Sequence, residues 1–209
     1  MVNIIWTFKG THGIIIISKE IKDLRETGRS LNMKEGTIML SKKVVEMLNA
    51  QVNAEFYSAY LYLDMANYYK DEGLDGYFNW YKIQAQEERD HAFLFMEYLQ
   101  QNGEAVVLDA IAKPDKEFKS FIDPLKAGAE HERVVTALIN DIYAVAYEEK
   151  DFRTMQFLDW FVKEQAEEED NADDNVKKFE LFGGDSRSLY ELDAEMAARV
   201  YSAPSLVIG

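Results

Sequence analysis

The sequence predicts an all-α protein, a bundle of four long helices with one long crossover connection and a short fifth helix near the C-terminus. Two observations carry this prediction. First, apolar residues recur at alternating spacings of three and four over four long segments, which is the period of one helix face. Second, the connections between these segments are short, long and short. Such lengths give two antiparallel pairs, with the third helix starting at the opposite end from where the second one stops.

The first two helical segments are joined by a short turn. Residues 41–70 form the first, and "DEGLDG" at 71–76 breaks its pattern. Residues 75–101 form the second, and "NG" at 102–103 ends it. The stripe of the first segment is Leu48, Val52, Glu55, Ala59, Tyr62 and Ala66. The stripe of the second is Tyr77, Tyr81, Gln84, Glu88, His91, Phe95 and Tyr98.

Residues 103–122, which contain Pro114, form the long connection. The third helix is expected to begin near Pro124, because proline suits the first turn of a helix. The fourth spans 151–182 and stops at "GG". "SLYE" at 188–191 is expected to act as a capping box for a fifth helix that ends near Arg199. The stripe of the third is Leu125, Glu132, Val135, Ile139, Ile142 and Ala146, and that of the fourth is Leu158, Phe161, Gln165, Glu168, Ala172 and Phe179.

The two ends of the chain differ from the bundle. Residues 1–38 are predicted to be an N-terminal extension, because "KEGTIM" at 34–39 would be encoded by a purine-rich stretch that resembles a translated ribosome-binding site before Met39. The alternative is a genuine disordered or partner-binding arm. Residues 39–200 are predicted to form the bundle and 201–209 a C-terminal tail, whose "SLVIG" ending resembles, over a very short stretch, peptides that load cargo into encapsulin shells.

Composition narrows the function classes. The net charge of −15 disfavours nucleic acid and anionic membranes as partners and is compatible with cations as cargo. The absence of cysteine excludes disulfides and thiolate metal sites. No stretch approaches the roughly 20 apolar residues of a membrane span.

Polar residues interrupt all four apolar stripes. They are Glu55, Glu88, His91, Glu132, Gln165 and Glu168. A buried carboxylate without a partner costs several kcal/mol, so such groups pair with cations or bind metal. Because the same stripes carry no lysine or arginine, the pattern predicts divalent or trivalent cations as partners.

Glu88 and His91 form a Glu-x-x-His motif, whose two side chains leave one helix face and can reach one ion. A di-iron bundle needs this motif together with single carboxylates from other helices, and Glu55 and Glu132 supply them. Taken alone, each residue has an ordinary explanation: a solvated glutamate, or a core tyrosine at Tyr62. The conjunction of polar intrusions near the middle of four helices favours a metal site.

His131 lies off the stripe of the third helical segment and is expected at the surface.

The residues that carry these patterns resemble the bacterial non-haem ferritins, over about residues 41–200. The matching stretches are "NAEFYSAYLY" at 53–62, "AQEERDH" at 85–91, "HERV" at 131–134 and "FLDWFVKEQAEEE" at 157–169. The resemblance implies a ferritin-like bundle and a 24-subunit, cytoplasmic cage that stores ferric mineral.

The resemblance also implies the iron ligands. Glu55, Glu88 and His91 would hold one iron, and Glu88 would bridge to a second iron held with Glu132 and Gln165. Tyr62 would lie beside this di-iron centre. A nearby third iron site would consist of Glu87, Glu164, Glu167 and Glu168.

The sequence also differs from related ferritin-like families at positions that bind haem or metal. Bacterioferritins have a haem-ligating methionine two residues before the histidine of this motif, where this chain has Arg89, so no haem is expected. A second Glu-x-x-His is missing, since the fourth segment reads "QAEE". Ala166 stands where several relatives have histidine, which is expected to alter the third site and to have little effect on the two main iron positions.

The predicted function is iron storage with ferroxidase activity, in which Fe(II) is oxidised by dioxygen in a homo-oligomer. One alternative is a storage shell that is passive toward oxygen. Another is a non-cage di-iron peroxidase or oxidase of the rubrerythrin-like type, although rubrerythrins add a cysteine-ligated iron module.

Overall fold

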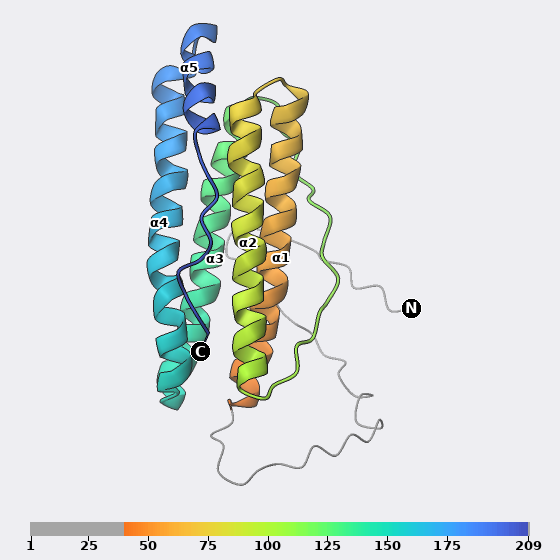
Figure 1. The fold of residues 1–209 in the computed structure, drawn as a ribbon, viewed down its shortest axis with the longest axis vertical. Helices are drawn as coiled ribbons and strands as arrows, with labels where there is room; N and C mark the ends of the chain where they lie inside the picture. The colour runs from red at the N-terminus through yellow and green to blue at the C-terminus, as the bar shows by residue number, and fades with distance from the viewer. Residues whose placement is uncertain (1–39, 209) are drawn as a thin grey trace. The chain divides into compact units, whose positions relative to one another are not determined.

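Five α-helices make up most of the described part of the chain, residues 40–208 of a computed structural model (Figure 1). Their bounds lie within about two residues of the predicted segments, and the all-α bundle is confirmed. The predicted extension 1–38 lies outside the described residues. The helices are α1 (Lys42–Asp71), α2 (Asp75–Gln101), α3 (Ile122–Glu149), α4 (Phe152–Phe182) and α5 (Ser186–Ala197).

The order of the helices in space follows from the connection lengths. In Figure 1, α1 and α2 run antiparallel, the connection 102–121 returns along the bundle, and α3 and α4 form the second antiparallel pair. Helix α1 packs mainly on α2 and α3 mainly on α4, while α1 and α3 also touch. The predicted single crossover is therefore present.

Local sequence explains where the helices begin and end. Gly73 and Gly103 adopt left-handed backbone conformations, with φ of 79° and 78°, just after α1 and α2 end. The Ser41 side chain accepts a hydrogen bond from the amide of Val44 and caps α1. The predicted capping box at 188–191 is wrong: Asp185 caps α5 by accepting from the amides of Arg187 and Ser188, because aspartate is a strong N-cap residue.

Helix α5 is fixed on the start of α2. Leu74, the N-cap of α2, has no side chain that can accept a hydrogen bond, and Asp193 of α5 supplies the missing acceptor. Its Oδ1 lies 2.8 Å from the amide nitrogen of Gly76 and 3.0 Å from that of Tyr77. A Cβ at position 76 would lie 1.7 Å from the carbonyl oxygen of Asp193, so the close approach requires glycine.

The core consists of two apolar clusters. One joins the first half of α1 to the ends of α2 and α3 and the start of α4, with Leu48, Phe95 and Phe161 at its centre. The other joins the second half of α1 to the start of α2 and α3, with Met65 and Tyr69 at its centre, and reaches α5. The buried polar residues from the four predicted stripes lie between the two clusters along the helices.

The C-terminal segment, residues 198–208, runs back along the bundle between α2 and α4 (Figure 1). The Tyr201 hydroxyl donates to Asp90 of α2 at 2.5 Å, and the Trp160 indole of α4 donates to Ser205 at 3.0 Å. Leu206 and Ile208 pack against the first apolar cluster. This segment is therefore packed on its own chain. None of the five described helices has the length and apolarity needed to cross a membrane.

Candidate metal centre

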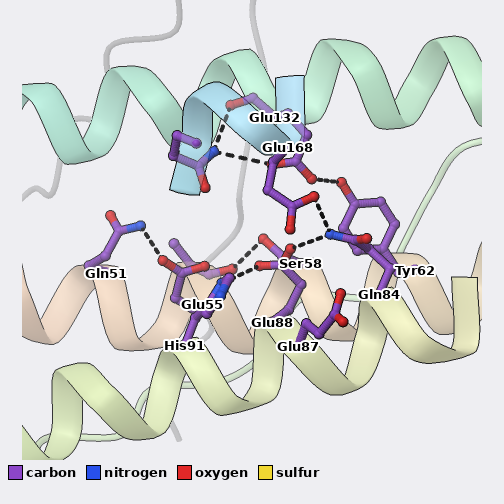
Figure 2. Close-up of polar contacts among 12 residues, drawn as sticks. Gln51, Glu55, Ser58, Tyr62, Gln84, Glu87, Glu88, His91, Glu132 and Glu168 are labelled. Carbon is purple, nitrogen blue, oxygen red and sulfur yellow. Dashed lines mark hydrogen bonds and ion pairs between the residues drawn. The ribbon is translucent and has the colours of Figure 1, made fainter. Parts of the chain in front are cut away.

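Glu55 of α1 meets Glu88 and His91 of α2 in the middle of the bundle (Figure 2). Each offers a ligand atom within 4.8 Å of the others, and all three side chains are buried. The Nδ1 atom of His91 lies 3.7 Å from Glu88 Oε2. The helical spacing explains this geometry, since positions i and i+3 share a face.

One oxygen in this cluster has no hydrogen-bond partner in the part of the chain that the structure describes. Glu55 Oε1 accepts from Gln51 Nε2 at 2.8 Å, but Glu55 Oε2 is buried with no hydrogen-bond partner among the described residues. Buried polar atoms almost always have a partner, so an orphan carboxylate oxygen next to a carboxylate and an imidazole is what a metal site leaves when its ion is removed.

Burial and mutual repulsion perturb the titration of these groups. Burial, reinforced by the charge of Glu88, raises the pKa of Glu55 to about 8. Burial would also raise the pKa of Glu88. The hydrogen bond to His91 and the charge of His91 outweigh burial and lower the pKa of Glu88 below its usual value. Burial alone would lower the pKa of His91, yet the Glu88 carboxylate raises it to about 10. Without metal, a proton on His91 thus compensates the charge of Glu88.

Glu132 of α3, the predicted ligand of a second iron, lies in the same buried layer. Its carboxylate accepts hydrogen bonds from the Tyr62 hydroxyl of α1 and, at 3.2 Å, from Gln165 Nε2 of α4. Burial and the nearby charge of Glu88 raise the pKa of Glu132 well above its usual value. The structure thus brings Tyr62, Glu132 and Gln165 together from three helices, and Figure 2 shows Tyr62 and Glu132 facing the layer that holds Glu55 and Glu88.

Gln84 connects the carboxylates of Glu88 and Glu168. Its Nε2 donates to Glu88 Oε1 at 3.2 Å and to Glu168 Oε2 of α4 at 2.8 Å. Burial raises the pKa of Glu168 to about 7. Gln84 lies on the predicted stripe of α2, but no role was predicted for it. The signal was present, since Gln51 and Gln84 each precede a glutamate of the cluster by four residues and donate to it.

The four carboxylates predicted to form a third iron site have different environments. Glu87 is half-buried and forms an ion pair with Arg199, which lies just beyond α5. Glu168 is buried and bonded to Gln84, Glu164 is half-buried, and Glu167 is exposed. No sequence pattern indicated Arg199, because its partner on α2 is 112 residues away in the chain.

His131 was expected at the surface, but the structure half-buries it against α1. Its Nε2 atom lies 2.7 Å from the Ser58 hydroxyl, and its ring packs edge-on against Tyr57 and Tyr62. Burial lowers its pKa to about 4, so the ring is neutral at pH 7. An off-stripe position on a helix can still reach a neighbouring helix at the edge of the core.

Taken together, the donor set fits iron. It offers carboxylate oxygens, one amide oxygen and one imidazole, which suit iron as it changes oxidation state. The side chains come from four helices, so one folded subunit holds the whole set.

Comparison with known proteins agrees with this geometry. The family model of the ferritin-like domain matches residues 45–182. The chain belongs to the ferritin family. Among curated proteins, a bacterial non-heme ferritin from Staphylococcus epidermidis is 37% identical over 164 residues, which cover 78% of this chain and 99% of that protein. A probable bacterial non-heme ferritin-like protein from Haemophilus influenzae is 36% identical over 158 residues, covering 76% of this chain and 96% of that protein.

Solved structures give the same answer for this member of the ferritin family. An open-pore ferritin from the hyperthermophilic archaeon Archaeoglobus fulgidus is 45% identical with a TM-score of 0.75, covering 77% of this chain and 98% of that one. An engineered closed form of that ferritin has 44% identity and a TM-score of 0.76, covering 78% and 99%. The predicted ferritin-like bundle is confirmed. Family membership implies iron storage, and the Glu55–Glu88–His91 cluster could hold a metal ion.

Proposed function

We propose that this protein oxidises Fe(II) with dioxygen at a di-iron centre inside each subunit and stores the ferric product as mineral in a cytoplasmic cage of 24 subunits. One observation carries the proposal: four helices converge on a buried set of carboxylates with one imidazole, in which Glu55 Oε2 has no hydrogen-bond partner among residues 40–208. A merely structural core would have no use for these buried acids.

The ligands form two adjacent metal positions. Glu55, Glu88 and His91 hold the first ferrous ion, and Glu88, Glu132 and Gln165 hold the second. Each ferrous ion gives one electron to dioxygen, which is thereby reduced by two electrons. Carboxylates stabilise the ferric product by their charge, whereas the neutral Gln165 makes the second position weaker, so that iron can leave for the mineral.

The surrounding residues prepare the centre for the ions. The Tyr62 hydroxyl holds Glu132 in place, and Gln51 and Gln84 hold Glu55 and Glu88. Protons that metal-free Glu55 and Glu132 retain through burial leave when iron binds, because ligands must be deprotonated.

Removal of a ligand tests the proposal. Changing Glu88→Ala or His91→Ala should lower the initial rate of Fe(II) oxidation at least about 100-fold, since even indirect support of a metal is worth up to about that factor. Glu97→Ala on the exposed face of α2 is the control and should keep the wild-type rate. The rate is followed by ferric absorbance after mixing with aerobic Fe(II). Wild-type rates in both ligand variants would contradict the assignment.

Two measurements separate the alternatives. A passive shell would take up Fe(II) without consuming oxygen, so an oxygen electrode distinguishes it from a ferroxidase. A non-cage di-iron peroxidase or oxidase would remain close to the 24.2 kDa mass of the chain, whereas a cage scatters light as a far larger particle.

A further inference from the structure

Arg199 places a positive charge directly beside the candidate metal centre. Its guanidinium forms an ion pair with Glu87, and both side chains are only 15% exposed. Most other ion pairs in the described residues lie at the surface. Arg187 of α5, for example, is 89% exposed where it meets Glu191. A mostly buried guanidinium is costly unless several groups hold it.

Several groups do hold Arg199. Its Nη1 donates to Gln84 Oε1 at 2.8 Å and to the carbonyl oxygen of Trp80 at 3.3 Å, and the guanidinium carbon lies 4.0 Å from the centre of the Trp80 ring. The carbonyl oxygen of Arg199 accepts from Asn79 Nδ2 at 3.0 Å. The rigid planar fork of arginine presents separate N–H donors to Glu87 and to Gln84.

Through Gln84, Arg199 also acts on the centre itself. Because Gln84 Oε1 accepts from Arg199, its amide nitrogen must point the other way, toward Glu88 and Glu168. Arg199 therefore neutralises Glu87 directly and, through one amide, fixes the two carboxylates on either side of Gln84.

We propose that Arg199 takes the place of a third metal ion, so that each subunit with its C-terminal segment docked binds metal at the di-iron centre alone. A divalent cation beside Glu87 would meet the guanidinium at close range in a poorly solvated site, and the repulsion excludes binding of both. The carboxylates predicted as a third site receive metal only after Arg199 leaves. This inference rests on the proposed function, because it presumes a di-iron centre next to Gln84.

The test counts metal ions in the apoprotein with Co²⁺ as probe, by calorimetric titration and by the visible absorption of bound Co²⁺. Arg199→Gln should bind one more ion per subunit than wild type. Adding Glu87→Gln to that variant should remove the extra ion. Arg187→Gln, which makes the same charge change at the surface, should match wild type. An Arg199→Gln count equal to wild type, or the same gain in Arg187→Gln, would overturn the proposal.

A second measurement uses the unchanged protein and stands even if Arg199→Gln fails to fold. Crystals of wild type soaked in Co²⁺ should show anomalous density at Glu55, Glu88 and His91 and none in contact with Glu87. An ion bound to Glu87 would overturn the inference. The proposed function fails separately: if His91→Ala binds as many Co²⁺ ions as wild type, the di-iron assignment is wrong, whatever Arg199 does.

Discussion

Glu88 is the residue on which the other charged groups of the centre depend. It lies between His91, which lowers its pKa, and the carboxylates of Glu55 and Glu132, whose pKa values are raised by burial and further by the charge of Glu88. Such coupling makes the metal-free centre hold protons that an unfolded chain would release. The cost of burying these acids therefore depends on pH.

The stability of the apoprotein should fall as pH rises from about 5 to 8. Glu55 and Glu168 titrate near 4.5 when unfolded but near 8 and 7 when folded, so over this range the folded state binds more protons than the unfolded state. Protonated His91, with a folded pKa of about 10, also contributes stability that is present below pH 6.5 and lost as pH rises toward 10. The slope should be about 1 kcal/mol per pH unit for each group.

Denaturant unfolding of the apoprotein at several pH values measures this slope. Glu55→Gln removes one titrating group and should give a shallower fall than wild type. Equal slopes for the two proteins would contradict the assigned pKa of Glu55. Because Co²⁺ displaces the protons, it should stabilise wild type more at pH 8 than at pH 5.

Sequence spacing was sufficient for residues whose partners lie on their own helix face. Glu-x-x-His on α2 and the polar intrusions on each stripe point inward because 3.6 residues complete a turn. Arg199 and His131 were beyond this reasoning, since their partners are 112 and 73 residues away in the chain. Such contacts depend on how α5 and α3 are placed, which no local period specifies.

At the scale of elements, helix boundaries followed from stop signals such as Gly73 and Gly103. The cap of α5 was misplaced by three residues because Ser188 and Asp185 both suit an N-cap, and only the backbone decides between them. Docking of α5 on α2 could not be predicted, because it depends on one side chain, Asp193, reaching the amides at the start of α2.

Gly76→Ala should weaken that docking. The new Cβ would clash with the backbone of Asp193, and relieving such overpacking costs about 1–3 kcal/mol of unfolding free energy. Gly184→Ala is the control, since its Cβ would meet nothing within 4 Å and the backbone there has no positive φ; it should stay within about 0.5 kcal/mol of wild type. Chemical denaturation compares the two. Equal stabilities would show that α5 docks without this close approach.

At the scale of the whole molecule, the proposed cage requires contacts between subunits, and we expect α4 and α5 to take part in them. Leu181 is 68% exposed and Tyr190 is 75% exposed in the single chain, and a subunit contact would remove both side chains from water. The double change Leu181→Asp and Tyr190→Asp should lower the particle mass in light scattering while leaving Co²⁺ binding intact. Gln100→Glu adds charge at another exposed position and should leave the mass unchanged. A wild-type mass in the double variant would place the subunit contacts elsewhere.

The polar layer between the two apolar clusters has a consequence for how the bundle opens. Each half has its own packed core, and the layer between them is held by polar contacts around buried carboxylates, with Glu55 Oε2 lacking a hydrogen-bond partner among the described residues. Amide hydrogen–deuterium exchange of the apoprotein should therefore show two groups of amides with different opening free energies. A bound ion links α1 to α2 within this polar layer. Co²⁺ should therefore make the two groups of amides exchange with the same opening free energy. The metal would then couple the two apolar clusters. Without it, the two ends of the same four helices would open independently of each other.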